Sequence, residues 1–206
     1  MKNILLLGKE ILADRCETVF RSAPGDDWQE HFTVMRGKWE KVGDRLIGEF
    51  PGNDGGILFT RQAYPDGYMM RCRMGTVLPA TRDVNCIFCG HWVEETDTLG
   101  EAYVCGLNGW YDGKSGIERN DNAMMRALTA SYTYTPGAEV EMCVGAIDGH
   151  TFMVVDGELV TEYLDPDPIP GGHFGFSPYC TRLFVHDIEI MRIAYIEKAQ
   201  CYEPEF

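Results

Sequence analysis

The clearest alternation of apolar and polar positions in the chain lies at residues 139–163, EVEMCVGAIDGHTFMVVDGELVTEY. Alternation with a period of two is typical of strands that are buried on one face. Asp148-Gly149 separates two such strands, and this dipeptide favours a type I′ turn because both residues tolerate a positive φ. Asp156-Gly157 forms a second turn signal before a third strand. The segment therefore predicts a three-stranded antiparallel unit of the kind found in β-sandwiches.

Strand patterns separated by turn residues continue over most of the chain. We expect further strands near residues 17–21, 38–42, 45–50, 55–61, 68–77, 84–93, 102–111, 174–177 and 183–193. Residues 122–130 are the exception, since their Ala, Met and Leu content favours a turn or two of helix, with a loop over one sheet as the alternative. This spacing predicts an all-β fold, an antiparallel two-sheet β-sandwich, rather than alternating βαβ units.

Length and composition agree with one soluble globular unit. The 206 residues, 45% of them hydrophobic, are enough for a single domain with its core at about 37–193 and an irregular segment at 1–36. The net charge of −14 argues against a nucleic-acid partner and against an anionic membrane surface. The short apolar run Ile4–Leu7 is too brief for a signal sequence, and the eight cysteines are irregularly spaced. We therefore expect free thiols and a cytoplasmic location.

Several segments resemble the concanavalin A-like lectin and glucanase superfamily. They are the opening hairpin WEKVGDRLIG at 39–48, the segment DVNCIF at 83–88, the Val155-Asp156-Gly157 hairpin, GHFGF at 172–176, and the last strand FVHDIEI at 184–190. Within the superfamily the chain is most similar to small bacterial domains of the 3-keto-disaccharide hydrolase type and to YesU-like proteins. The resemblance implies a two-sheet jelly roll and a sugar-related role, with the ligand on the concave face of one sheet.

Candidate catalytic carboxylates are few. Glycoside hydrolysis uses two carboxylates on either side of the scissile bond, about 5–5.5 Å apart when configuration is retained. Glu95 and Asp97 would share a strand face, but the next position on that face is Leu99. A solvated strand end is the favoured interpretation, so we do not expect conventional retaining chemistry there. We nominate His91 and Glu94 as catalytic residues, either one serving as a proton shuttle.

A metal site has weak support in the sequence. Cys86 and Cys89 are followed by His91, but residues three apart on a regular strand point to opposite faces and cannot share a metal without a bulge. Residues 165–168, Asp-Pro-Asp-Pro, could contribute to a calcium site, although a rigid connection explains the alternating prolines more simply. No metal ligand is assigned and no cofactor is firmly implied. The sequence leaves open whether the protein binds a divalent metal ion.

The richest combination of polar and aromatic residues lies between positions 103 and 122. Aromatic rings stack on the C–H faces of sugars, while amide, carboxylate and guanidinium groups bind their hydroxyls. Trp110 would stack on a sugar above Gly106, and Arg119 could hold the carboxylate of an acidic sugar. The competing interpretation is that these aromatics fill the core. The expected substrate-binding residues are Tyr103, Asn108, Trp110, Arg119, Asn120 and His173.

These observations favour an intracellular enzyme that cleaves or rearranges a small glycoside on the concave sheet face. An oxidised sugar or a uronic acid is one form that this glycoside could take. The alternative is a carbohydrate-binding domain without catalysis, or a subunit of a larger sugar-processing complex. A module that uses its aromatics to bind another protein is a third class, since fold does not dictate function. The expected partner is a small sugar or oligosaccharide, with self-association left open.

Overall fold

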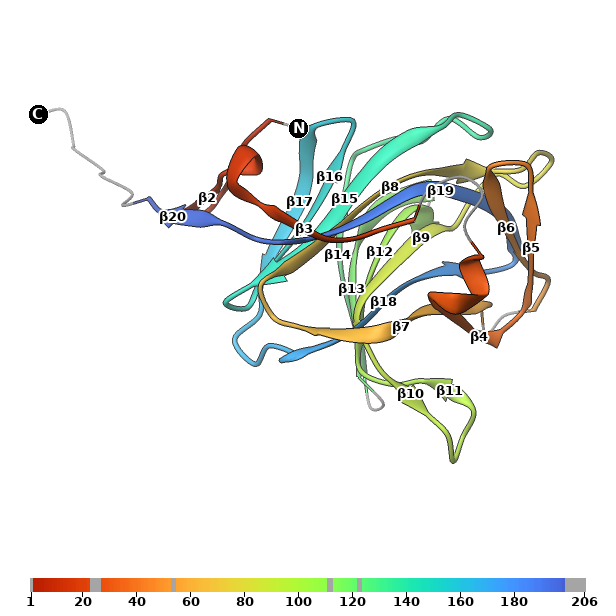
Figure 1. Ribbon diagram of the computed structural model, residues 1–206. Helices are drawn as coiled ribbons and strands as arrows, with labels where there is room; N and C mark the ends of the chain where they lie inside the picture. Colours follow the sequence, from red (N-terminus) through yellow and green to blue (C-terminus); the bar gives the residue numbers. More distant parts are fainter. Residues whose placement is uncertain (1, 23–26, 53–54, 111–112, 122–123, 199–206) are drawn as a thin grey trace, which may run out of the picture.

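Two large antiparallel sheets lie face to face in the computed structural model of the protein (Figure 1). The structure describes residues 2–22, 27–52, 55–110, 113–121 and 124–198. One sheet has seven strands. In spatial order they are β14 (Met124–Ala130), β13 (Lys114–Asp121), β12 (Ala102–Trp110), β9 (Val84–Gly90), β18 (Gly171–Pro178), β7 (Ile57–Pro65) and β4 (Phe32–Arg36).

The second sheet has eight strands and contains the three-stranded unit that the sequence predicts. In spatial order they are β17 (Glu158–Leu164), β16 (His150–Val155), β15 (Val140–Ile147), β8 (Tyr68–Thr76), β19 (Thr181–Arg192), β6 (Arg45–Phe50) and β5 (Lys38–Val42), with β3 (Glu17–Arg21) also paired to β19. Asp148 and Gly149 have φ values of 50° and 76°. Both are positive, as a type I′ turn requires, so the predicted hairpin is confirmed.

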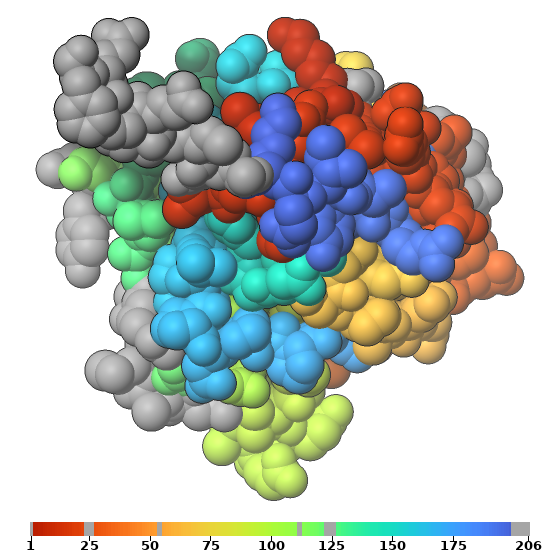
Figure 2. Space-filling model, turned by 90° about the vertical axis from the view of Figure 1, so that its left-hand side faces the viewer, coloured from red at the N-terminus to blue at the C-terminus, as the bar shows by residue number. Residues whose placement is uncertain are grey.

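A small sheet, a hairpin and two short helices lie around the sandwich. A three-stranded sheet joins both ends of the chain through β1 (Ile4–Leu6), β2 (Lys9–Ile11) and β20 (Tyr195–Glu197). The hairpin β10 (Trp92–Val93) and β11 (Thr98–Leu99) projects from the body and forms the yellow-green knob at the lower edge of Figure 2. Short 3₁₀ helices occur at η1 (Ala13–Arg15) and η2 (Trp28–Glu30). None of the described helices is long and apolar enough to cross a bilayer.

Alternate residues of the seven-stranded sheet face two different apolar clusters. Cys86 and Phe88 point into the main core between the sheets, together with residues of the eight-stranded sheet such as Met74. Ile87 and Val104 instead face outward, where they form a separate cluster. This alternation follows from the two-residue period of a strand, and it divides the sheet into a core face and an outward face.

The helix expected at residues 122–130 is wrong. Met124–Ala130 forms the edge strand β14, which pairs with β13 from Asp121↔Met124 to Ser115↔Ala130. A continuous backbone ladder outweighs the modest helix propensity of Ala, Met and Leu. Asn122 lies outside the described residues.

The expectation that Cys86 and Cys89 face opposite sides is also wrong. His173 of β18 pairs with Gly90 and Gly175 pairs with Ile87, so β9 carries an extra residue at this point. The bulge gives Cys89 a φ of 49° and directs both cysteines into the main core. The seven cysteines in the described ranges are free thiols, as expected. Over those same ranges, no cluster of three His, Cys, Asp or Glu side chains is arranged to hold a metal ion.

Candidate functional site

A groove of about 730 Å³ lies on the outward face of the seven-stranded sheet. This volume is within the range of small-molecule sites. Strands β9, β12 and β13 provide its central part, and the β10–β11 hairpin forms one rim through Thr98 and Leu99. The polar and aromatic lining includes Arg36, Asp83, Asn85, Trp110, Glu118, Asn120 and Tyr179.

The groove has an apolar floor beside its polar groups. Ile57, Ile87 and Val104 belong to the outward-facing cluster, and Trp92 and Leu99 of the hairpin pack against it. The hairpin therefore rests on apolar side chains of the sheet although it projects from the body.

Arg36 is held at the rim of the groove. Its guanidinium lies 5.4 Å from the centroid of the Trp92 ring, and its Nη2 atom is 3.6 Å from a carboxylate oxygen of Asp97. A cation over the face of an indole is attracted by the electron density of the ring. These contacts link β4 to the hairpin.

Asp83 is a buried carboxylic acid in the groove. The residue is 6% exposed and has a φ of 60°, immediately before β9 begins. Burial raises the pKa of its carboxyl to about 7, and the charge of Glu118 raises it as well. Arg82, whose Nε is 3.4 Å from the carboxylate, and a hydrogen bond with Asn85 oppose this shift. Asp83 is thus a carboxyl group that holds its proton up to near-neutral pH.

Glu118 is the second carboxyl group of the groove. It is half-buried on β13, and burial raises its pKa above the ordinary value. The indole Nε1 of Trp110 donates a hydrogen bond of 3.1 Å to Glu118 Oε2, which favours the ionised form. The two carboxyl groups of the groove therefore differ in the groups that stabilise their ionised forms: Arg82 and Asn85 for Asp83, and the Trp110 indole for Glu118.

Trp110 reaches the groove because the residue beneath its ring, Gly106, has no side chain. The pairing of β12 with β13 is interrupted between Gly106 and Trp110, and Asn108 within this bulge has a φ of 56°. A Cβ atom at Gly106 would lie 2.9 Å from Cη2 of the indole and 2.0 Å from Oδ1 of Asn85. Gly106 therefore allows the indole and the Asn85 amide to lie close to the backbone, in line with the space predicted there.

Two of the predicted substrate-binding residues line the groove. They are Trp110 and Asn120. The Nδ2 group of Asn120 donates to the carbonyl oxygens of Leu99 at 3.1 Å and Gly100 at 2.7 Å. Asn120 thus ties the base of the hairpin to β13, and its role toward a ligand stays a prediction.

The expected placement of Tyr103 and Arg119 on the ligand face is wrong. Tyr103 is fully buried between the sheets and stacks on Phe88, with 5.2 Å between the ring centroids. Arg119 pairs with Tyr103 in the β12–β13 ladder and is 4% exposed. Its Nε and the Tyr103 hydroxyl each lie 2.7 Å from Oδ2 of Asp165. Both side chains therefore serve a buried ionic network on the core face.

Asn108 likewise holds the fold rather than lining the groove. Its Nδ2 group donates to the carbonyl oxygens of Tyr134 at 3.0 Å and Thr81 at 3.3 Å. Because its positive φ belongs to the bulge, Asn108 does not continue the regular alternation that would align it with Trp110.

The three remaining predicted residues lie away from the groove lining. His173 shares the outward face, where it stacks on Phe59 at 5.5 Å and its Nδ1 lies 2.7 Å from the carbonyl oxygen of Thr60. His91 is exposed just beyond the far end of β9 from Asp83, with Nε2 2.8 Å from the Gly171 carbonyl oxygen. Glu94 is exposed in the turn of the β10–β11 hairpin. The structure does not bring His91 and Glu94 together with Trp110.

Several polar residues of the groove are absent from the sequence-based predictions, among them Asp83, Asn85 and Glu118. In the segment DVNCIF, Asp83 and Asn85 are separated by one residue and lie beside a hydrophobic run. Glu118 alternates with Asn120 in the same way on β13. Alternation of polar residues indicates that Glu118 and Asn120 share a strand face, but it does not show which strand faces meet in the groove.

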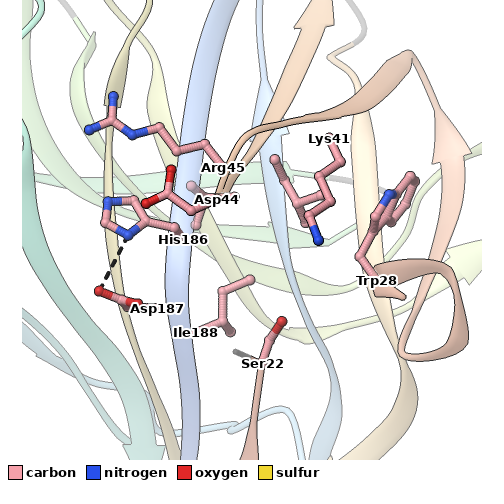
Figure 3. Close-up of a pocket in the computed structure, with 10 residues that line it drawn as sticks. Ser22, Trp28, Lys41, Asp44, Arg45, His186, Asp187 and Ile188 are labelled. Carbon is pink, nitrogen blue, oxygen red and sulfur yellow. Dashed lines mark ion pairs between the residues drawn. The ribbon is translucent and has the colours of Figure 1, made fainter. Parts of the chain in front are cut away.

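A second cavity lies by the eight-stranded sheet, next to β19 and the β5–β6 turn (Figure 3). His186 lies there with its Nδ1 atom 3.3 Å from Asp187 and its Nε2 atom 3.0 Å from Glu139, while Trp28 and Lys41 are across from it in the view. The cavity measures about 20 Å³, enough for one water molecule. The cavity is too small for a sugar.

Comparison with known proteins identifies the fold. No protein-family model and no curated protein matches the sequence. The carbohydrate-binding module CBM66 from Bacillus subtilis superposes with a TM-score of 0.65 at 10% identity, over 78% of this chain and 95% of that module. A Bacillus subtilis protein of unknown function with a galectin-like fold gives a TM-score of 0.68 at 10% identity, over 86% and 96%. The fold is a concanavalin A-like, galectin-like sandwich.

An enzyme structure shares the same architecture. The Crh5 transglycosylase in complex with NAG has a TM-score of 0.59 at 10% identity, and the match covers 93% of this chain and 86% of that one. At these identities the likeness concerns the fold, which confirms the expected two-sheet jelly roll.

Proposed function

We propose that the protein binds a small glycoside in the groove of the seven-stranded sheet and hydrolyses its glycosidic bond. The presence of Asp83 and Glu118 in one groove carries this proposal, because two carboxyl groups with unequal environments are what acid and base roles require. Trp110 beside Glu118 adds an aromatic surface suited to a sugar ring. The sandwich fold shared with a carbohydrate-binding module and a transglycosylase supports a carbohydrate ligand.

In this proposal Asp83 is the general acid. Its pKa of about 7 keeps it protonated in mildly acidic solution and about half protonated at neutral pH, so it can transfer a proton to the glycosidic oxygen as the bond to the anomeric carbon breaks. Glu118, whose ionised form accepts the Trp110 hydrogen bond, either removes a proton from the attacking water or attacks the anomeric carbon itself. Water supplies the hydroxyl of the new reducing end in both cases. If Glu118 is the nucleophile, Asp83 removes the proton of the water that hydrolyses the glycosyl-enzyme; if Glu118 is the base, it takes that proton, and solvent exchange returns it to Asp83. The anomeric configuration of the product, followed by NMR, separates the two roles of Glu118.

A second candidate function is carbohydrate binding without catalysis. The observation in its favour is the match to CBM66, of which 95% is covered. In that case Asp83 and Glu118 would bind sugar hydroxyls instead of transferring protons.

One set of variants tests the proposed hydrolysis. We would screen glycosides by thermal shift and then measure turnover for the wild type, Asp83→Asn and Glu118→Gln. Loss of a general acid or base lowers turnover by about 10²- to 10⁴-fold, and we expect this for both variants. Glu94→Gln, in the exposed hairpin turn, is the matched control and should retain turnover.

The outcomes separate the two functions. Binding without turnover in the wild type would favour the non-catalytic module. Turnover that survives Asp83→Asn and Glu118→Gln would move catalysis away from this pair. A flat screen over all glycosides would contradict a sugar ligand altogether.

A further inference from the structure

Asn85 has a buried acceptor atom that the protein does not satisfy. The residue is 6% exposed, lines the groove, and its Oδ1 atom has no hydrogen-bond partner. A hydrogen bond with the Asn85 side chain lowers the pKa of the Asp83 carboxyl. A buried polar atom without a partner costs free energy, so its retention in a groove calls for a group that arrives with the ligand.

The chemistry of that group follows from the atom. An amide oxygen accepts hydrogen bonds and cannot donate them, so the ligand must offer an O–H or N–H. Oδ1 lies directly over Gly106, where a Cβ atom would be 2.0 Å from it, and the Trp110 indole lies beside the same glycine. A ring that stacks near Trp110 would therefore present an edge hydroxyl toward Asn85.

The charges of the groove indicate the class of sugar. Asp83 and Glu118 line it as acids, and Arg36 is the one basic residue among its described lining residues. Arg36 already contacts Asp97 and Trp92 at the rim. Arg119, which the sequence offered as a partner for an acidic sugar, lies on the core face and is bonded to Asp165 and Asp121 at 2.7 Å each. Arg82, beside the groove, lies 3.4 Å from the carboxyl of Asp83. Among the described residues, a ligand carboxylate would thus meet the charge of Glu118 and only cations that already contact a carboxyl group.

From these contacts we infer that the groove accepts an uncharged glycoside and excludes uronic acids, and that Asn85 selects it by accepting a hydrogen bond from one ring hydroxyl. This inference rests on the proposed sugar-binding function and names its substrate class. Asn85 acts here as a specificity-determining residue, next to the proposed acid but with no proton to transfer.

The first measurement compares sugars that differ in one group. We would titrate the wild-type protein calorimetrically with methyl glycosides of glucose, galactose and xylose in both anomers, and with the matching methyl glucuronide and galacturonide. Methyl aglycones are poor leaving groups, so binding is measured apart from turnover. We expect the neutral glycoside to bind about tenfold or more tightly than its uronate partner, because like charges in a groove repel.

The second measurement locates the hydroxyl. Monodeoxy analogues of the tightest binder are titrated against the wild type, Asn85→Ala and Asn85→Asp. One deoxy analogue should bind the wild type about 10- to 100-fold more weakly than the parent, and this penalty should vanish in Asn85→Ala. Asn85→Asp keeps an acceptor oxygen in the same place and should keep the penalty. Unchanged thermal midpoints would show that both variants fold.

Either of two results overturns the inference: a uronate that binds as tightly as its neutral partner, or deoxy penalties that all survive Asn85→Ala. A protein that binds none of the glycosides overturns this inference and the proposed function together. If the Asn85 effects appear but Asp83→Asn leaves turnover unchanged, the hydrolysis proposal fails while the specificity assignment stands. If turnover depends on Asp83 but the Asn85 variants show no effect on binding, the specificity assignment fails while the hydrolysis proposal stands.

Discussion

Two buried aspartates, on opposite sides of the seven-stranded sheet, have pKa values that are shifted in opposite directions. Asp165, 3% exposed on the core side, accepts hydrogen bonds from Tyr103, Arg119 and the backbone N–H of Asp167. Burial alone would raise its pKa, but these donors outweigh it and hold the pKa below the usual value. Asp83, 6% exposed on the groove side, has the Asn85 amide and the exposed Arg82 as opposing contacts, and its pKa rises to about 7.

The difference teaches how donors decide what a buried acid does. A carboxylate surrounded by donors keeps its charge and joins parts of the fold, here β12, β13 and the segment after β17. A carboxyl group with few donors around it keeps its proton instead, and that proton is then available for transfer. Burial is similar at both sites, so exposure by itself does not identify the reactive acid.

The largest expected effect comes from breaking the core-side network. Arg119→Met removes the cation and leaves Asp165 with a buried, poorly compensated charge. Removal of one partner of a buried pair costs about 3–5 kcal/mol, and we expect a loss of that size in the free energy of unfolding, measured by urea denaturation. The double variant Arg119→Met, Asp165→Leu should recover part of it. A single variant as stable as the wild type would show that the network contributes little.

The pH dependence of stability separates the two aspartates. Asp83 has a pKa of 3.8 when unfolded and about 7 when folded, so the folded state binds its proton more tightly. Its contribution is fully present below pH 3.8 and is lost as the pH rises through 7, about 4 kcal/mol at most at roughly 1.4 kcal/mol per pH unit. Asp165 has a lowered pKa, so its contribution is present above pH 3.8 and is lost on acidification below it.

Asp83→Asn should therefore gain stability relative to the wild type between pH 4 and 7, and the difference should level off above 7. Urea denaturation of both proteins across this range provides the measurement. Parallel stability curves would indicate that Asp83 has an ordinary pKa in the folded protein.

A smaller effect is expected at the partner of Glu118. Trp110→Phe keeps an aromatic ring but removes the Nε1 donor, so the pKa of Glu118 should rise further. If ionised Glu118 is required for hydrolysis, the acidic limb of the kcat/KM profile moves to higher pH, while the alkaline limb near pH 7 set by Asp83 stays in place. A profile identical to that of the wild type would remove Glu118 from the base role.

The smallest expected effect concerns the originally nominated His91. It is exposed and bonded to the Gly171 carbonyl, away from the groove lining. With Asp83 and Glu118 as the acid pair, His91→Ala should retain turnover and nearly the same thermal midpoint. Loss of turnover in a folded His91→Ala protein would support His91 as the proton shuttle. It would also contradict the choice of Asp83 as the general acid from its raised pKa.

Local signals in the sequence were enough for the fold. The Asp148-Gly149 and Asp156-Gly157 turns and the alternating strands around them depend on φ preferences and a two-residue period, both of which are properties of neighbouring residues. The same reasoning correctly expected strands around 38–50 and 183–193.

The tertiary structure decided the site. Bulges at Cys89 and Asn108 reset which side chains face the groove, and a pattern with a strict period of two cannot anticipate them. Pairing with β13 also made a strand of a segment with helical composition. Asp83 and Glu118 come to line one groove from the two sides of β12 only after the ladder forms, and their pKa values depend on burial and on groups from other parts of the chain. Such long-range contacts have no local signature, because the free energy of a charge is set by what surrounds it in space.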